Sequence, residues 1–292
     1  MNKKVLTNEY TANNIVELLR GGKTYFEKLE TLIEKAEKNI ELHTYIFNDD
    51  YTGKKIGKAL RIAASRNVQI NILVDGYASQ NLTESFLDEM KKAGISFQFF
   101  EPWLKSRHHY LGRRMHHKII TIDDKWALVG GINIADRYND LHEAKAWLDF
   151  AVLVEGAIVP LVADYCREFR NKYKTKTTEP AIIITSTNIS KTYEKDCLIR
   201  IRGNDWFWHK NEISISYLEL FHHAKEEIMI LCSYFIPGKV LRRLLVSAAK
   251  KGVQIKVVMS GKSDVGFSKA AERWLYDWLL RNGIELYEYK SG

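Results

Sequence analysis

The sequence has few cysteines, and their number and spacing exclude some classes of protein. Three cysteines stand among 292 residues, and no two of them have the C-x-x-C spacing. A disulfide-stapled domain would carry an even and denser set, so we expect reduced thiols in a cytoplasmic protein. The three are Cys166, Cys197 and Cys232.

The sequence also lacks an apolar run long enough to cross a membrane. Its most apolar window, residues 146–165, contains Asp149, Glu155 and Asp164, which a membrane span would not tolerate. The N-terminal stretch "MNKKVLTNEYTANN" carries charge but no apolar run, so we expect no signal peptide. Any membrane contact is therefore expected to be peripheral, on the inner face.

The composition fits a globular enzyme with a basic surface. With 46% hydrophobic and 12% aromatic residues over 292 positions, the chain can build two cores. The net charge of +8 and the isoelectric point near 9.1 favour a polyanionic partner. A membrane surface and a nucleic acid satisfy that charge equally well.

The most informative segment is "RRMHHKIITIDDKWALVGGINIADRY". His116, Lys118 and Asp123 stand at the spacing H-x-K-x(4)-D, and Asn133 follows ten residues later, two after Gly131. "HHKIITI" is apolar and β-branched enough for a strand, on which His116 and Lys118 share a face. "DDK" predicts a turn and "WALVGG" a returning strand. We therefore expect a hairpin that carries Asp123 and Asn133 at its ends and frames the His116 and Lys118 pair.

These residue types suit chemistry on a phosphodiester. Histidine can act as a nucleophile or general acid near neutral pH, and lysine supplies a charge for a phosphate oxygen. Gly131 would let the backbone come close, and no metal or cofactor is needed. Structural alternatives stay open: Asp123 as a turn residue and Gly131 as a bulge. His117 should face the other way and be structural.

An internal repeat is the second informative feature. Gly94 and Ile95, which open an expected strand, recur as Gly283 and Ile284. Each copy reads helix, strand, helix, strand, helix, strand. Further matches pair Ala63, Ala64, Val68, Gln69, Ile70 and Gly76 with Ala248, Ala249, Val253, Gln254, Ile255 and Gly261, and the helix stripe Tyr25, Leu29, Leu32, Ile33, Ala36 with Ile213, Tyr217, Leu220, Phe221, Ala224.

The repeat predicts an α/β protein of two similar halves. We expect domains at 1–178 and 179–292, joined by "TKTTEP" at 175–180. His116 lies 22 residues past Gly94, so its counterpart would fall near position 305, outside these 292 residues. The second half is therefore expected to be incomplete, without its own H-x-K-x(4)-D motif.

Two other segments are candidates for the functional surface. Residues 103–114, "WLKSRHHYLGRR", interleave aromatic and apolar groups with cations, which suits an anionic lipid interface or, equally, a solvated loop. Asp264 follows the expected strand "IKVVMSG", at the end where α/β sheets bind ligands. We include Asp264 as a residue that could line the site.

The motif and its surroundings resemble the phospholipase D superfamily, and in particular bacterial cardiolipin synthases. Here "HHKI...GGINIADRY" is similar to the family's typical "HRKI...GGMNIGDEY". "SYFIPGKVLRRLL", "AAKKGVQIKVVMSGKSD" and "GIELYEYKSG" are similar to the stretch that leads into the family's second motif. The sequence departs by having no N-terminal membrane segment, Gly131 where the superfamily often has Ser, and one motif where the family has two.

The resemblance implies a phospholipase D-like fold of two repeated α/β/α sandwich halves with mixed sheets. It also implies a mechanism in which one histidine attacks phosphorus and another protonates the leaving alcohol. On that pattern His116 is the nucleophile, Lys118 and Asn133 bind the phosphoryl oxygens, and Asp123 supports the site by hydrogen bonds. An alcohol, such as the head group of phosphatidylglycerol, or water then resolves the phosphohistidine.

Three functions follow from the sequence. The first is a phosphatidyltransferase or phospholipase acting on anionic phospholipids such as phosphatidylglycerol. The second is a nuclease of the same superfamily, with nucleic acid as substrate. The third is a non-catalytic lipid-binding or scaffold protein. With one motif, the chain is expected to be inactive alone, unless a homodimer supplies the second histidine.

Overall fold

The computed structural model describes residues 9–101, 114–141, 145–172, 196–204, 211–261 and 266–290. The chain forms two compact units, Met1–Ile201 and Arg202–Gly292. The boundary lies later than the expected one between 178 and 179, because the segment after position 195 is bonded to the first unit. The Cys197 N–H donates to Asn14 O (2.8 Å), and Ile199 pairs with Thr11. The expected linker at 175–180 lies outside the described residues.

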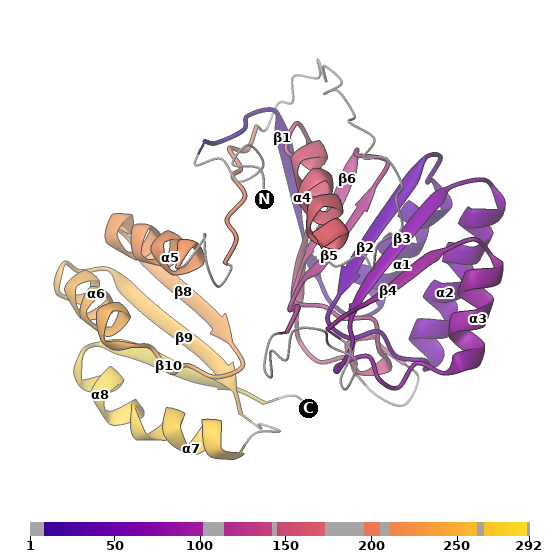
Figure 1. Ribbon diagram of the computed structural model, residues 1–292. Coiled ribbons are helices and arrows are strands. Elements are labelled where there is room, and N and C mark those ends of the chain that lie inside the picture. The colour runs from indigo at the N-terminus through magenta and orange to yellow at the C-terminus, as the bar shows by residue number, and fades with distance from the viewer. Residues whose placement is uncertain are drawn as a thin grey trace. The chain divides into compact units, whose positions relative to one another are not determined.

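The first unit is built on a seven-stranded mixed sheet (Figure 1). Its strand order is β1-β7-β6-β5-β2-β3-β4. Strands β2, β3 and β4 are parallel, whereas β5, β6, β7 and β1 each pair antiparallel with their neighbours. The strands are β1 (Asn14–Arg20), β2 (Asn39–Thr44), β3 (Gln69–Asp75), β4 (Ser96–Phe100), β5 (Lys118–Ile122), β6 (Trp126–Gly130) and β7 (Phe150–Gly156).

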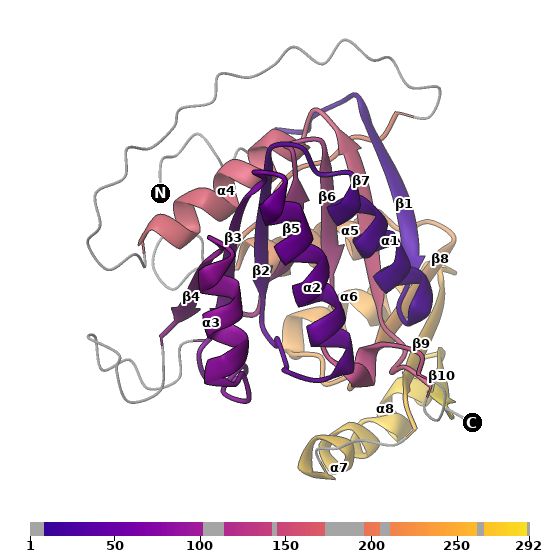
Figure 2. The same cartoon turned by 90° about the vertical axis from the view of Figure 1, so that its right-hand side faces the viewer.

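Helices cover both faces of this sheet (Figures 1 and 2). Alternate residues of β2 show the two faces: Ile40 and Leu42 lie in the core with α1, α2 and α3, while Glu41 bonds Arg170 of α4. The first unit is therefore an α/β/α sandwich, as expected. The helices are α1 (Lys23–Glu34), α2 (Tyr51–Ser65), α3 (Glu84–Lys92), α4 (Val159–Lys172) and the 3₁₀ turn η1 (Asp136–Tyr138).

The second unit has a smaller, three-stranded sheet of order β10-β9-β8. Both strand pairs are parallel, so the described part of this unit shows no mixed sheet. Its core contains Leu245, Val257 and Leu279, each fully buried. The elements are α5 (Glu212–His223), β8 (Glu227–Cys232), α6 (Lys239–Lys250), β9 (Gln254–Ser260), α7 (Gly266–Trp274), α8 (Tyr276–Arg281) and β10 (Ile284–Tyr289).

The structure confirms the internal repeat down to strand register. Asn39 of β2 is opposite Gln69 of β3, and Glu227 of β8 is opposite Gln254 of β9, which is the counterpart of Gln69. The helix stripes differ in burial, however. The stripe of α1 is buried, whereas α5 has no buried residue, and its Leu220 is 65% exposed.

Two expectations about the whole chain can be compared with the structure. No helix of the described residues is both long and apolar enough to cross a membrane. All three cysteines are free thiols.

Candidate active site

The alternation of β5 brings His116 and Lys118 together. His116 stands two residues before Lys118, the first residue of β5; His116 is in part exposed to solvent, whereas Lys118 is 8% exposed. The Lys118 Nζ lies 3.1 Å from Nδ1 and 3.2 Å from Nε2 of His116, and donates to the His116 carbonyl at 3.2 Å. The shared face predicted from the spacing is therefore present.

The ring of Tyr45, the residue after β2, lies beside both His116 and Lys118. The ring centroids of Tyr45 and His116 are 4.7 Å apart, and Lys118 Nζ lies 5.0 Å from the Tyr45 ring. Burial is the main cause that raises the pKa of the Tyr45 hydroxyl, followed by the negative charge of Asp75. The ring thus limits where the imidazole and the ammonium can move.

Asp75, the last residue of β3, fixes the segment that leads to His116. Its buried carboxylate accepts hydrogen bonds from the backbone N–H of Met115 (2.9 Å), Tyr77 (3.0 Å) and Ala78 (3.0 Å). Because Met115 directly precedes His116, the nucleophile candidate is tied to the end of a neighbouring strand. Asp75 therefore acts as a positioning residue.

The returning strand β6 brings Asn133 back to the same end of the sheet. Asn133 is 2% exposed; its Oδ1 accepts from the Ile46 N–H (3.0 Å), and its Nδ2 donates to the Tyr138 hydroxyl (2.8 Å). Both ends of the amide thus bond within the protein and fix the loop next to Tyr45. Its expected contact with a phosphoryl oxygen stays a prediction.

Gly131 lies against the carboxylate of Asp149. A Cβ at position 131 would lie 2.1 Å from Asp149 Oδ1, so no side chain fits there as the site stands. Asp149 Oδ1 also accepts the N–H of Phe150 at 2.7 Å. Gly131 is a place of close approach, and the contact that requires it is with Asp149.

Burial and charge set the protonation states of the pair. Burial lowers the pKa of the Lys118 ammonium to about 8, although the negative charge of Asp149 acts in the opposite direction. Burial also lowers the pKa of His116, with a further contribution from the positive charge of Lys118. A neutral imidazole beside a cation at pH 7 is the state that a nucleophile acting on a phosphate requires.

Asp123 is not part of this cluster, although the spacing grouped it with His116 and Lys118. It lies in the β5–β6 turn, at the opposite end of β5, where its carboxylate accepts from the backbone N–H of Glu37 (2.8 Å), Lys38 (2.7 Å) and Asn39 (2.9 Å). Seven residues of extended chain span roughly 20 Å. Asp123 therefore holds the start of β2 and makes no direct contact with the reacting groups.

His117 faces away from the site, as expected. Its Nε2 lies 3.3 Å from the Tyr165 hydroxyl, and its ring packs against Phe169 of α4 and stacks on His43. Burial lowers the pKa of His117 to about 3, so the imidazole is neutral at pH 7. This histidine belongs to the packing between the sheet and α4.

Two of the sequence candidates cannot be placed. Asp264 and the segment 102–113 lie outside the described residues. Conversely, sequence reasoning missed Tyr45, Asp75 and Asp149. Asp75 could have been found, because it ends an apolar parallel strand at the edge where such sheets bind ligands.

Within the described residues, no group of three or more His, Cys, Asp or Glu is placed to hold a metal ion. A family model described as "Cardiolipin synthase, PLD-like domain" matches residues 29–173 and 217–292. The chain belongs to this family. Its expected resemblance to the phospholipase D superfamily is thereby confirmed.

Individual relatives agree with the family assignment. Cardiolipin synthase B of Salmonella typhi is 32% identical, over 95% of this chain and 67% of that protein. Cardiolipin synthase B of Escherichia coli K12 is 30% identical with the same coverage. Among solved structures, phosphatidylserine synthase of Haemophilus influenzae has a TM-score of 0.63 at 15% identity, covering 94% of this chain and 71% of that one, which shows a shared fold.

Proposed function

We propose that this member of the cardiolipin synthase, PLD-like family is a phosphatidyltransferase or phosphodiesterase in which His116 attacks phosphorus. The observation that carries the proposal is the pair of His116 and Lys118, whose side chains lie 3.1 Å apart against Tyr45. A neutral imidazole next to a buried ammonium can attack a phosphodiester while the developing negative charge is stabilised.

The reaction would proceed in two displacements. A ring nitrogen of His116 forms a bond to phosphorus, the bond between phosphorus and the leaving alcohol breaks, and Lys118 holds a non-bridging oxygen. The leaving oxygen takes a proton from an acid, which we propose is a second histidine of the same motif. An incoming alcohol or water then attacks phosphorus, the bond between phosphorus and His116 breaks, and the second histidine, now neutral, takes the proton of the incoming group. Asn133 and Gly131 would help to shape the phosphate site.

The proposed substrate is an anionic phospholipid such as phosphatidylglycerol, reached from the inner face of a membrane. Support comes from the names of the relatives, which are cardiolipin synthases, and from the net charge of +8. No cofactor is part of the proposal. A nucleic acid as substrate is the alternative that the experiment must exclude.

The test is covalent labelling, with phosphatidylglycerol that carries a radioactive phosphate, of the chain extended by a second H-x-K-x(4)-D motif. We expect label that is stable to base and labile to acid, as a phosphohistidine is, and its complete loss in His116→Ala. His117→Gln is the matched control and should keep the label, because His117 faces α4. Label that persists in His116→Ala would contradict the proposal. Cleavage of single-stranded DNA in place of the lipid would contradict it as well.

A further inference from the structure

Helix α7 presents apolar residues outward and polar residues inward. Phe267 and Trp274 are 87% and 80% exposed, whereas Lys269 and Glu272 are 7% and 0% exposed. Positions 267, 271 and 274 fall on one face of a helix, so Ala271 completes an apolar stripe. An ordinary surface helix has the reverse arrangement.

Hydrogen bonds hold the polar face of α7 inside the second unit. The Lys269 ammonium donates to Ser260 O (2.7 Å), Glu272 Oε1 (3.0 Å) and the Tyr276 hydroxyl (3.1 Å). Turning the helix to bury Trp274 would break this buried network, which is costly. The apolar stripe of α7 is therefore fixed at the surface.

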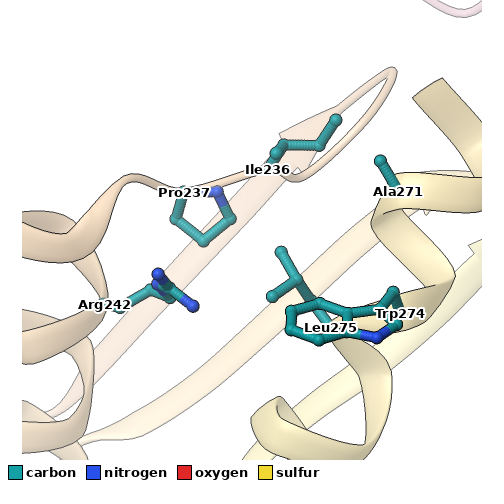
Figure 3. A pocket seen from close by; sticks show the side chains of 6 residues that line it. All are labelled: Ile236, Pro237, Arg242, Ala271, Trp274 and Leu275. Atoms are coloured by element: carbon teal, nitrogen blue, oxygen red, sulfur yellow. The ribbon is translucent and has the colours of Figure 1, made fainter.

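A pocket lies beside this stripe, between the start of α6 and α7 (Figure 3). Its volume of about 360 Å³ is within the range of small-molecule sites. Arg242 is the one charged residue of its lining, and its guanidinium carbon lies 5.6 Å from the ring of Trp278. The lining residues are Ile236, Pro237, Arg242, Ala271, Trp274 and Leu275.

The internal repeat shows that the fold does not require this pocket. The counterpart of Arg242 in the first unit is Gly57, where a Cβ would lie 2.7 Å from Met90 Cε, so α2 packs directly against α3. Counted back from Gly283 and Ile284, the helix of the second unit that stands in the place of α3 is α8, so α7 has no counterpart helix between β3 and β4. Helix α7 and its apolar stripe are therefore a feature that the second unit has and the first unit lacks.

Helix α6, which contributes Arg242 to this pocket, carries several cations near its start. Lys239, Arg242 and Arg243 stand in its first turns and form no ion pair with any described residue. Exposed tryptophan and phenylalanine beside unpaired cations match the two components of an anionic lipid interface, its apolar interior and its phosphate layer.

We infer that this α6–α7 surface docks onto a membrane of anionic phospholipid, with Phe267 and Trp274 entering the interface and Arg242 and Arg243 contacting phosphates. The choice of phospholipid rests on the proposed function, but the surface belongs to the second unit and His116 to the first. Docking can therefore be measured without turnover.

The test uses the full chain and vesicles of phosphatidylcholine, with or without phosphatidylglycerol. We expect binding to the anionic vesicles only, weakened on the order of tenfold in Trp274→Ser and about fivefold in Arg243→Gln. Brominated lipids should quench tryptophan fluorescence less in Trp274→Ser than in the parent protein. Matched controls in the first unit are Tyr51→Ser and Lys58→Gln; both side chains are exposed on α2, and Lys58 is the counterpart of Arg243. Both controls should bind as the parent does.

Several results would overturn the inference. These are equal binding to neutral vesicles, unchanged binding of Trp274→Ser, or equal losses in the two control variants. A change of oligomeric state in Trp274→Ser, without loss of vesicle binding, would make the surface an interface between protein chains and would also overturn it. Vesicle binding without His116 labelling would leave the docking surface standing and count against the proposed function alone.

Discussion

At the scale of single residues, protonation of Lys118 decides the upper pH limit of the proposed reaction. Its pKa of about 8 means that the ammonium loses its charge as the pH rises through that value, and phosphate binding should weaken with it. His116 sets the lower pH limit. Because its pKa is lowered from the usual 6.5, the imidazole stays neutral at pH values at which an ordinary histidine would be protonated. The interval between the two limits includes pH 7.

The Asp149 carboxylate should set the position of the upper limit. Because its negative charge raises the pKa of Lys118, Asp149→Asn should move the alkaline limb of kcat/KM to lower pH, by about one unit. The measurement is a pH profile with a soluble phosphodiester. Glu17→Gln removes an exposed carboxylate of β1 and should leave the profile unchanged. An unshifted alkaline limb in Asp149→Asn would show that another group controls it.

At the scale of elements, the two ends of β5 in the β5–β6 hairpin have different proposed roles, although the motif H-x-K-x(4)-D groups their residues. We propose that the β5 end with His116 supports the chemistry, whereas the turn with Asp123 supports stability. Asp123 and Asp124 have φ values of 55° and 53°, the left-handed conformation that a tight hairpin turn requires and that aspartate tolerates.

Replacing Asp123 should therefore affect stability and leave chemistry intact. Asp123→Ala removes the acceptor of three backbone N–H groups, and we expect the free energy of unfolding to fall by about 2–3 kcal/mol with kcat of the folded protein unchanged. Denaturant unfolding and kcat, measured on the same preparation, check this. Asp123→Asn keeps an acceptor and should lose less. A large loss of kcat in a stably folded Asp123→Ala would restore this aspartate to the site.

The hairpin also shows how far sequence reasoning reached. Strand alternation correctly placed His116 with Lys118 and turned His117 away, because both follow from a period of two residues. The predicted turn at "DDK" already put Asp123 at the far end of the strand, whereas the motif H-x-K-x(4)-D grouped it with His116 and Lys118; the structure agrees with the turn. Tyr45, Asp75 and Asp149 were missed because they lie just after β2, at the end of β3 and just before β7, and only the assembled sheet brings them to the site.

At the scale of the whole molecule, the repeat could be recognised in the sequence because the apolar positions of the helices and the first residues of the strands have the same spacing in both copies. The unit boundary was placed too early, since the pairing of residues 197–199 with the N-terminal segment has no sequence signal. The two copies have also diverged before their third strands, where the first copy has α3 alone and the second has both α7 and α8.

The single motif leads to a prediction for the protein as a whole. One histidine cannot attack phosphorus and protonate the leaving oxygen in the same step, so these 292 residues alone should turn over phosphatidylglycerol more slowly than about 1 per second. The assay is steady-state turnover across a range of protein concentrations. Specific activity that rises with concentration would indicate that a second copy supplies the acid. Fast turnover independent of concentration would contradict the prediction.

The contact between Gly131 and Asp149 has a consequence for the evolution of this family. A serine at position 131 would place its Cβ 2.1 Å from the Asp149 carboxylate, so a serine fits there only if the side chain at position 149 moves or is smaller. Mutations at the two positions should be epistatic: a serine harmful beside aspartate would be tolerated once position 149 carries a smaller side chain. Relatives with serine at the position of Gly131 should therefore carry a compensating change at the position of Asp149. Reconstructed ancestral sequences would show which of the two changes came first.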